Sequence, residues 1–437
     1  MTIPAASQFL RRRGVALIVL LILVIYGFEA HARRRLMSTP ASLGDQGAYL
    51  AHAQNMRESG YAFIAERNRM PVFPFLLSLI YRPGLSETEA LRRAQAFNVN
   101  LSIILLLLLF LVFRKFFPPP HAMALLCATA FGVFLYRAVN AQTEVLFYFV
   151  SFCGFVLLLR MFIAPRWWLA ASAGATIGLA HLTKASVLPA LGVWVAVFFA
   201  QILWDARREH GSNTWRGLGM LVLVLATFLA VVFPYIQTSK RIYGQYFYNV
   251  NSTFVMWCDS SSEAMKFLEA YGDKAKWREL PSDQIPSFSK YWREHSIAQM
   301  AHRLTHGLRR VATQNLMAIG YYKFVVAFVF AAGILWLRQR QRARQLLAEQ
   351  PFAAAFCVLF FTAYLLLYGW YDMIVNDTRF SLSIFLPFIF AASLFVLKMG
   401  RDRMVAIAGR RLPFDQFFPG LLICLALIDV LYNAARA

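Results

Sequence analysis

Charged side chains stand next to apolar runs at several places in the sequence, where a charge that leaves water needs a partner. They are Asp45 and Arg69 in the polar stretch after the first apolar run, Glu144 in NAQTEVLF, Lys184 in GLAHLTKAS, and Asp377 with Arg379 in NDTRFSLSIFLP. Charged groups in or beside membrane-spanning segments are costly and are by default candidates for a functional site. Carboxylates that face several cations would suit the transfer of a group from a lipid-linked phosphate.

The residue types divide this chemistry between them. Cations would hold the phosphate as it becomes the leaving group and would stabilise the charge that develops in the transition state. A carboxylate, Asp45 or Glu144, would take the proton from the incoming hydroxyl. Arginine grips phosphate in a bidentate manner, so Arg69 and Arg379 are stronger candidates for direct contact than Lys184. The simpler alternative is that Lys184 and Arg379 only extend toward water and that Glu144 is their structural partner.

Asp45 stands at the start of a predicted short helix that lies on the membrane surface. The apolar residues of GAYLAHAQNM recur at helical spacing, and Gly60 ends the pattern. Residues three and four apart are neighbours on a helix, so Asp45, Tyr49 and His52 share one face. Asp45 could instead serve only as the N-cap of this helix.

Other residues of these stretches are possible contacts to a substrate or a metal ion, namely Tyr49, His52, Arg67 and Asp377. Asp45, His52 and Glu144 could bind a divalent cation if they converge. No spacing in the sequence demands a metal, and the five cysteines form no disulfide framework or metal-ligand pattern.

The composition places these residues in a membrane protein. Of the 437 residues, 59% are hydrophobic, more than one soluble core can bury. The net charge of +22 comes from arginines clustered in short segments between apolar runs, which is how membrane topology is encoded and which argues against nucleic-acid binding. We therefore expect an all-α, polytopic helical bundle with a lipid bilayer as its partner.

Eleven apolar runs have roughly membrane-spanning length. They are residues 14–28, 99–113, 122–136, 145–163, 167–182, 187–204, 218–236, 325–337, 352–370, 380–397 and 417–431. Alternating their direction places the arginine-rich segments on one side, which predicts a cytoplasmic N-terminus by the positive-inside rule. The charged motifs then lie together on the extracytoplasmic side, the periplasmic side if this is a bacterial inner membrane. Arg33, Arg34 and Arg35 fall on that side against the rule, where they could contact lipid headgroups or a phosphate-bearing substrate.

The domain organisation follows from these runs. Residues 1–400 form a transmembrane catalytic domain with two long external segments, 29–98 as the catalytic loop and 237–322 on the substrate or acceptor side. Short amphipathic helices are expected in the first of them. Residues 401–437 form a basic cytoplasmic loop and a final transmembrane helix.

Five motifs in order resemble the GT-C superfamily of polytopic glycosyltransferases, particularly the branch with protein O-mannosyltransferases and the bacterial aminoarabinose transferase acting on lipid A. The motifs are GDQGAYLAHA, NRMPVFPFL, TEVLF, GLAHLTK and TRFSLSIFLP, and their order agrees over about residues 10–400. The family typically has an acidic pair in the first loop, whereas Gln46 follows Asp45 here. This departure leaves Glu144 as the second carboxylate.

The resemblance implies an enzyme that takes a sugar from a polyprenyl-phosphate-linked donor and adds it to a hydroxyl of a glycan, lipid or protein. It implies inversion at the anomeric carbon with Asp45 as general base. A flippase or transporter of lipid-linked sugars is an alternative, which would place charges along a path through the membrane midplane. A ligase or polymerase of lipid-linked glycans is another, distinguished by its diphosphate donor.

Overall fold

Long helices dominate the fold. The computed structural model describes residues 5–36, 40, 45–66, 69–208, 214–271, 280–281, 283–407 and 409–434. Within these residues, ten helices are long and apolar enough to cross a membrane. They are α1 (Ala5–Leu36), α4 (Glu87–Arg114), the continuous α5, η1 and α6 (Pro119–Thr129, Ala130–Phe134, Leu135–Arg137), α7 (Glu144–Ile163), η2 with α9 (Ala185–Val187, Leu188–Arg208), α10 (Thr214–Tyr243), α16 (Ile319–Arg338), α18 (Pro351–Tyr371), α19 with α20 (Thr378–Leu382, Phe385–Gly400) and α21 (Phe414–Ala434). The chain is thus an all-helical, multi-pass membrane protein.

The one predicted run that is not among these ten helices, residues 167–182, forms the shorter helix α8 (Trp167–Thr183, 17 residues). It packs closely on α10 through two glycines. A Cβ added at Gly174 would collide with the carbonyl of Val224, and one at Gly178 would lie 2.9 Å from the Cβ of Val231. Close backbone contact of this kind fixes the position of α8, and therefore of the residues at its end.

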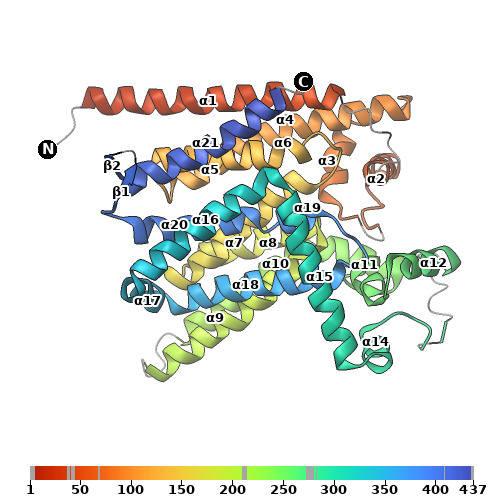
Figure 1. The fold of residues 1–437 in the computed structure, drawn as a ribbon. Coiled ribbons are helices and arrows are strands. Elements are labelled where there is room, and N and C mark those ends of the chain that lie inside the picture. The colour runs from red at the N-terminus through yellow and green to blue at the C-terminus, as the bar shows by residue number, and fades with distance from the viewer. Residues whose placement is uncertain are drawn as a thin grey trace.

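The remaining elements are short, except for α15 (Ile297–Met317), whose 21 residues pack against α18. They are α2 (Gln46–Glu58), α3 (Val72–Ile80), α11 (Val250–Thr253), η3 (Val255–Trp257), α12 (Ser261–Tyr271), α14 (Phe288–Glu294), α15 (Ile297–Met317), α17 (Arg340–Glu349) and the antiparallel strands β1 (Met404–Ile407) and β2 (Arg410–Pro413). Figure 1 shows α2, α3, α11 and α12 at one end, here called the site end, and α17 with the two strands at the other. The strands fall in the segment predicted as a basic loop.

Two helices extend well beyond their apolar runs. The sequence predicts a span at residues 14–28 and another at 99–113, whereas α1 reaches Leu36 and α4 begins at Glu87. A capping box starts α4, because the Ser86 side chain accepts from the backbone of Glu89 while the Glu89 carboxylate accepts from the backbone of Ser86. The loop that joins them is consequently shorter than the predicted 29–98.

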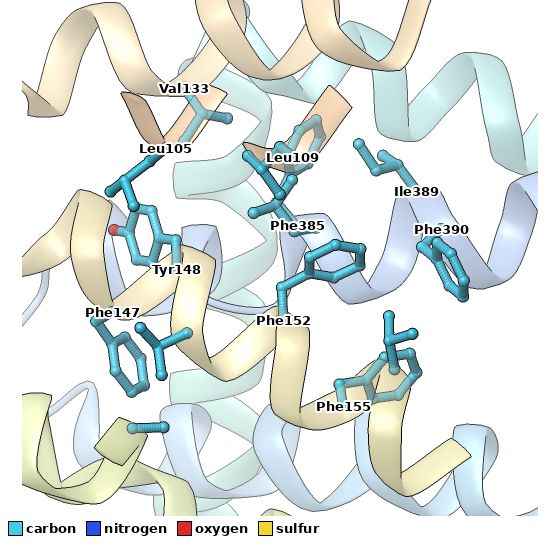
Figure 2. Packing of buried hydrophobic residues seen from close by; sticks show 14 of the residues in the cluster. Leu105, Leu109, Val133, Phe147, Tyr148, Phe152, Phe155, Phe385, Ile389 and Phe390 are labelled. Atoms are coloured by element: carbon cyan, nitrogen blue, oxygen red, sulfur yellow. The ribbon is translucent and has the colours of Figure 1, made fainter. Parts of the chain in front are cut away.

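The core surrounds α7, which is apolar on all sides. Figure 2 shows Tyr148 and Phe152 of α7 near Leu105 and Leu109 of α4, with Phe385 and Phe390 of α20 beside them. The rings of Phe152 and Phe390 meet edge to face with centroids 5.5 Å apart. Most of α7 is buried, so the helix has little freedom to rotate, and the residue at its first turn, Glu144, is held in one orientation.

Candidate active site

Asp45 is held between two arginines. Its Oδ1 lies 2.7 Å from a guanidinium nitrogen of Arg69 and its Oδ2 lies 2.6 Å from Arg379. Asp45 occupies the N-cap position of α2, but its carboxylate makes no capping hydrogen bond. The alternative that Asp45 is only a helix cap is therefore wrong, and the carboxylate instead joins the first polar stretch to a helix 334 positions later.

Glu144 and Lys184 form a second pair beside the first. Glu144 begins α7 and is almost fully buried, and Lys184 follows α8 in an extended conformation that ends that helix. Lys184 Nζ lies 3.2 Å from Glu144 Oε1, and Arg379 Nη1 lies 3.7 Å from the same oxygen. The Thr143 hydroxyl donates to the carbonyl of Thr183 and so ties the two helix ends together. Arg379 is the link that joins both pairs into one network.

Asp377 orients Arg379. Its Oδ1 accepts a hydrogen bond from the backbone N–H of Arg379 and caps α19, and its Oδ2 lies 3.1 Å from the Arg379 Nε. Arg137, at the end of α6, donates to Thr378 Oγ1 and lies 3.5 Å from Asp377. The Tyr148 hydroxyl donates to the carbonyl of Arg379. Asp377, which the sequence offers as a substrate or metal contact, thus contacts protein groups that position the arginine.

Two neighbours of Asp45 fix the start of α2. The ring of Tyr49 is buried, lies 5.7 Å from the Arg69 guanidinium and meets Phe73 edge to face. The amide oxygen of Gln46 accepts from the Ala141 backbone N–H at 2.9 Å and from the Gln95 amide at 3.2 Å. Gln46 therefore attaches the Asp45 backbone to the turn that precedes α7.

The network faces a cavity of about 650 Å³ at the site end. Charged and polar residues line one part of it and apolar or aromatic residues the rest. The polar lining includes Asp45, Tyr49, Arg69, Glu144, His181, Thr183, Lys184, Asn249 and Arg379. The apolar lining includes Leu188, Pro189, Tyr235, Phe247, Val255, Leu268, Leu367, Tyr371, Ile374 and Phe380. A cavity of this size and mixed polarity is typical of a small-molecule site.

The charges around the cavity shift each other's protonation. Burial by itself raises the pKa of Asp45, but the nearby Arg69 and Arg379 outweigh it, and the net result is a pKa below the ordinary 3.8. Burial lowers the pKa of Lys184 below its ordinary value, while Glu144 acts in the opposite direction. Asp45 is thus an ionised carboxylate at neutral pH.

His52 does not join this arrangement. His52 is buried on α2 against the ring of Phe63, with centroids 6.2 Å apart, and is not among the residues that line the cavity. Arg67 lies outside the described residues. Within the described part of the chain, no three or more His, Cys, Asp or Glu side chains are grouped so as to hold a metal ion.

Sequence reasoning missed several residues of the site, among them Arg137, His181 and Gln46. Arg137 follows an apolar run in the same manner as Lys184, which was a usable signal. His181 stands inside GLAHLTK, but an isolated histidine in an apolar run gives no indication of which face it occupies. Gln46 was noted only as a departure from the acidic pair.

Comparison with models of known protein families, with characterised proteins and with solved structures finds no match.

Proposed function

We propose that the protein is a glycosyltransferase that moves a sugar from a polyprenyl-phosphate-linked donor to a hydroxyl of a glycan, lipid or protein acceptor. The observation that carries the proposal is that Arg69, Lys184 and Arg379, from three separate parts of the chain, meet the carboxylates of Asp45 and Glu144 at the wall of one amphipathic cavity. Cations suit the phosphate of such a donor and the apolar wall suits its lipid chain.

In the proposed reaction, the phosphate of the donor binds to Arg69 and Arg379, for which it competes with the carboxylate of Asp45. The acceptor oxygen forms a bond to the anomeric carbon as the bond from that carbon to the phosphate oxygen breaks. The acceptor proton passes to the released oxygen of Asp45. Polyprenyl phosphate leaves with the bonding electrons, and the arginines and Lys184 stabilise the charge that it gains. This single displacement inverts the anomeric centre.

The position of the charges favours an enzyme over a transporter. A transporter of lipid-linked sugars would be expected to place charged groups along a path near the membrane midplane. Here the network gathers at the site end, next to the short helices α2 and α19 (Figure 1). The resemblance of the five sequence motifs to GT-C glycosyltransferases points the same way.

The orientation is part of the proposal. Arginines are concentrated in α17 and near the two strands, which lie at the end of the bundle opposite the site (Figure 1). By the positive-inside rule this supports a cytoplasmic N-terminus and an extracytoplasmic site in a bacterial inner membrane. The donor would then bind from the outer leaflet.

Asp45→Asn tests the proposal, with Asp402→Asn as control because Asp402 is an exposed aspartate away from the site. The assay follows transfer of radiolabel from undecaprenyl phosphate carrying glucose, mannose or arabinose to acceptors in membrane vesicles of cells that lack the protein. The parent protein should transfer one of these sugars, and Asp45→Asn should lose about a hundredfold or more of that rate.

Binding of unlabelled undecaprenyl phosphate distinguishes a loss of the catalytic base from a loss of phosphate binding. Asp45→Asn should bind it at least as well as the parent, because the amide competes less with phosphate for Arg69 and Arg379. Transfer by Asp45→Asn within a few-fold of the parent would remove Asp45 from the role of base. Failure of the parent to bind undecaprenyl phosphate would refute the proposed donor.

A further inference from the structure

His181 is a buried polar side chain in the cavity wall that the proposed reaction does not use. It stands in the last turn of α8, three residues before Lys184, and is 3% exposed. Its Nδ1 is buried and has no hydrogen-bond partner within the described part of the chain. The other ring nitrogen, Nε2, is not fully buried and also has no partner among the described residues, so it is the atom of this cavity-lining ring that a group in the cavity can reach.

Two phenylalanines define the space around this ring. His181 meets Phe228 and Phe247 edge to face, with centroids 5.9 and 5.7 Å apart, and the two phenylalanine rings are parallel to each other. Phe247 also lines the cavity and has φ of 53°, a left-handed conformation that bulky residues seldom adopt. Such strained positions cluster at ligand sites.

The backbone holds His181 firmly in place. Gly178, one turn earlier on the same face, allows α8 to approach α10 closely, and Phe228 of α10 is the residue that His181 contacts. This packing fixes the backbone of His181, and the two phenylalanine rings flank its side chain. A hydrogen bond from the imidazole is therefore directed at a fixed point, which is what a selective contact requires.

The surroundings indicate an uncharged partner. Burial disfavours an imidazolium at His181, and a neutral imidazole offers one donor and one acceptor. The phosphate of the donor is bound by the cations of the network, of which Lys184 stands three residues after His181. A sugar ring presents hydroxyls at its edge and C–H groups on its faces, which suits a neutral imidazole beside an aromatic face.

We infer that His181 forms a hydrogen bond with a hydroxyl of the transferred sugar and thereby determines which sugar the cavity accepts. This inference rests on the proposed glycosyl transfer. A site that hydrogen-bonds a substrate hydroxyl rejects analogues that lack it, because its own buried polar group is then left unpaired. His181 would thus act on sugar preference, while the cation network acts on the phosphate that all such donors share.

The test compares the binding of undecaprenyl phosphate with that of undecaprenyl phosphate carrying glucose, mannose or arabinose. The parent protein should bind one glycosylated lipid more tightly than the bare phosphate. His181→Phe should lose that preference by about tenfold or more, while its affinity for undecaprenyl phosphate stays within twofold. His181→Asn, which keeps a donor and an acceptor, should retain part of the preference and serves if the phenylalanine variant does not fold.

His121→Phe is the matched control. His121 is equally buried and its Nδ1 likewise has no partner within the described residues, but its Nε2 is bonded to Ser393 at 2.8 Å and the residue does not line the cavity, so its replacement should leave sugar preference unchanged. A sugar preference that survives in both His181 variants would refute the role of His181 without refuting the proposed function. A parent that binds all lipids of the panel equally would do the same. A parent that binds none of the four lipids would overturn the proposed function as well.

Discussion

The pair of Lys184 and Glu144 offers a test of the site geometry that does not depend on any substrate. Glu144 has a side chain that is 2% exposed, and its two cationic neighbours are Lys184 at 3.2 Å and Arg379 at 3.7 Å. Lys184→Met removes the nearer cation and keeps most of the side-chain volume. Glu144→Gln removes the carboxylate, and the double variant removes both charges together.

The expected magnitude follows from burial. Removing one partner of a buried ion pair costs about 3–5 kcal/mol, because the other charge is left uncompensated. Arg379 remains near Glu144 in Lys184→Met, and the Lys184 side chain is 20% exposed, so we expect the lower end, about 3 kcal/mol. The double variant leaves neither charge alone. It should therefore lose less than the sum of the two single variants, with a coupling energy of about 2 kcal/mol.

Unfolding by sodium dodecyl sulfate in mixed micelles, followed by circular dichroism, measures these free energies. Lys290→Met, Glu294→Gln and their combination provide the control cycle, since that pair is 4.0 Å apart and more exposed, and its coupling should be below about 0.5 kcal/mol. If the Lys184 and Glu144 variants are each nearly neutral and strictly additive, the two side chains do not form a buried pair, and the proposed network loses one of its cations.

Two further predictions concern α2. Burial, with a contribution from Arg69, lowers the pKa of His52 from its ordinary 6.5 to about 4. Between pH 6.5 and pH 4, His52 therefore binds a proton in the unfolded chain but not in the folded chain. The free energy of unfolding should hence fall by about 3 kcal/mol as pH drops from 6.5 to 4, and this loss should be absent in His52→Phe; equal pH dependence of parent and variant would contradict the burial of His52. Gln46→Met should leave the Ala141 N–H unpaired and destabilise the protein by about 1–3 kcal/mol, with a fall in sugar transfer as Asp45 shifts. Unchanged stability and transfer in Gln46→Met would show that this hydrogen bond does not position Asp45.

The sequence by itself determined the class of fold, because the relation between an apolar run and a spanning helix is local. Ten of the eleven predicted runs form helices long enough to cross a membrane, and the other forms the shorter α8. The ends of the helices were less predictable. The charged end of α1 and the charged start of α4 extend past their apolar runs. At α4, capping by Ser86 and Glu89 allows the helix to begin before the apolar run.

The charged residues near the spans were also visible in the sequence, because burial of a charge is costly wherever it occurs. Their partners were not. Asp45 meets Arg379 across 334 positions, and only the packing of α2 against the helices at the site end brings them within 2.6 Å. Spacing along α2 correctly placed Tyr49 and His52 on a common buried face, but it could not show that only Tyr49 lines the cavity.

Tertiary structure alone decided which polar groups act on the cavity and which support it. Asp377 and Arg379 are two residues apart, yet Asp377 caps a helix and orients the arginine that reaches Asp45. His181 owes its place in the cavity wall to the glycines that let α8 and α10 approach. Hydrophobic periodicity records only whether a side chain leaves water, whereas the partner that it meets depends on helices that are distant in sequence and are brought together by packing.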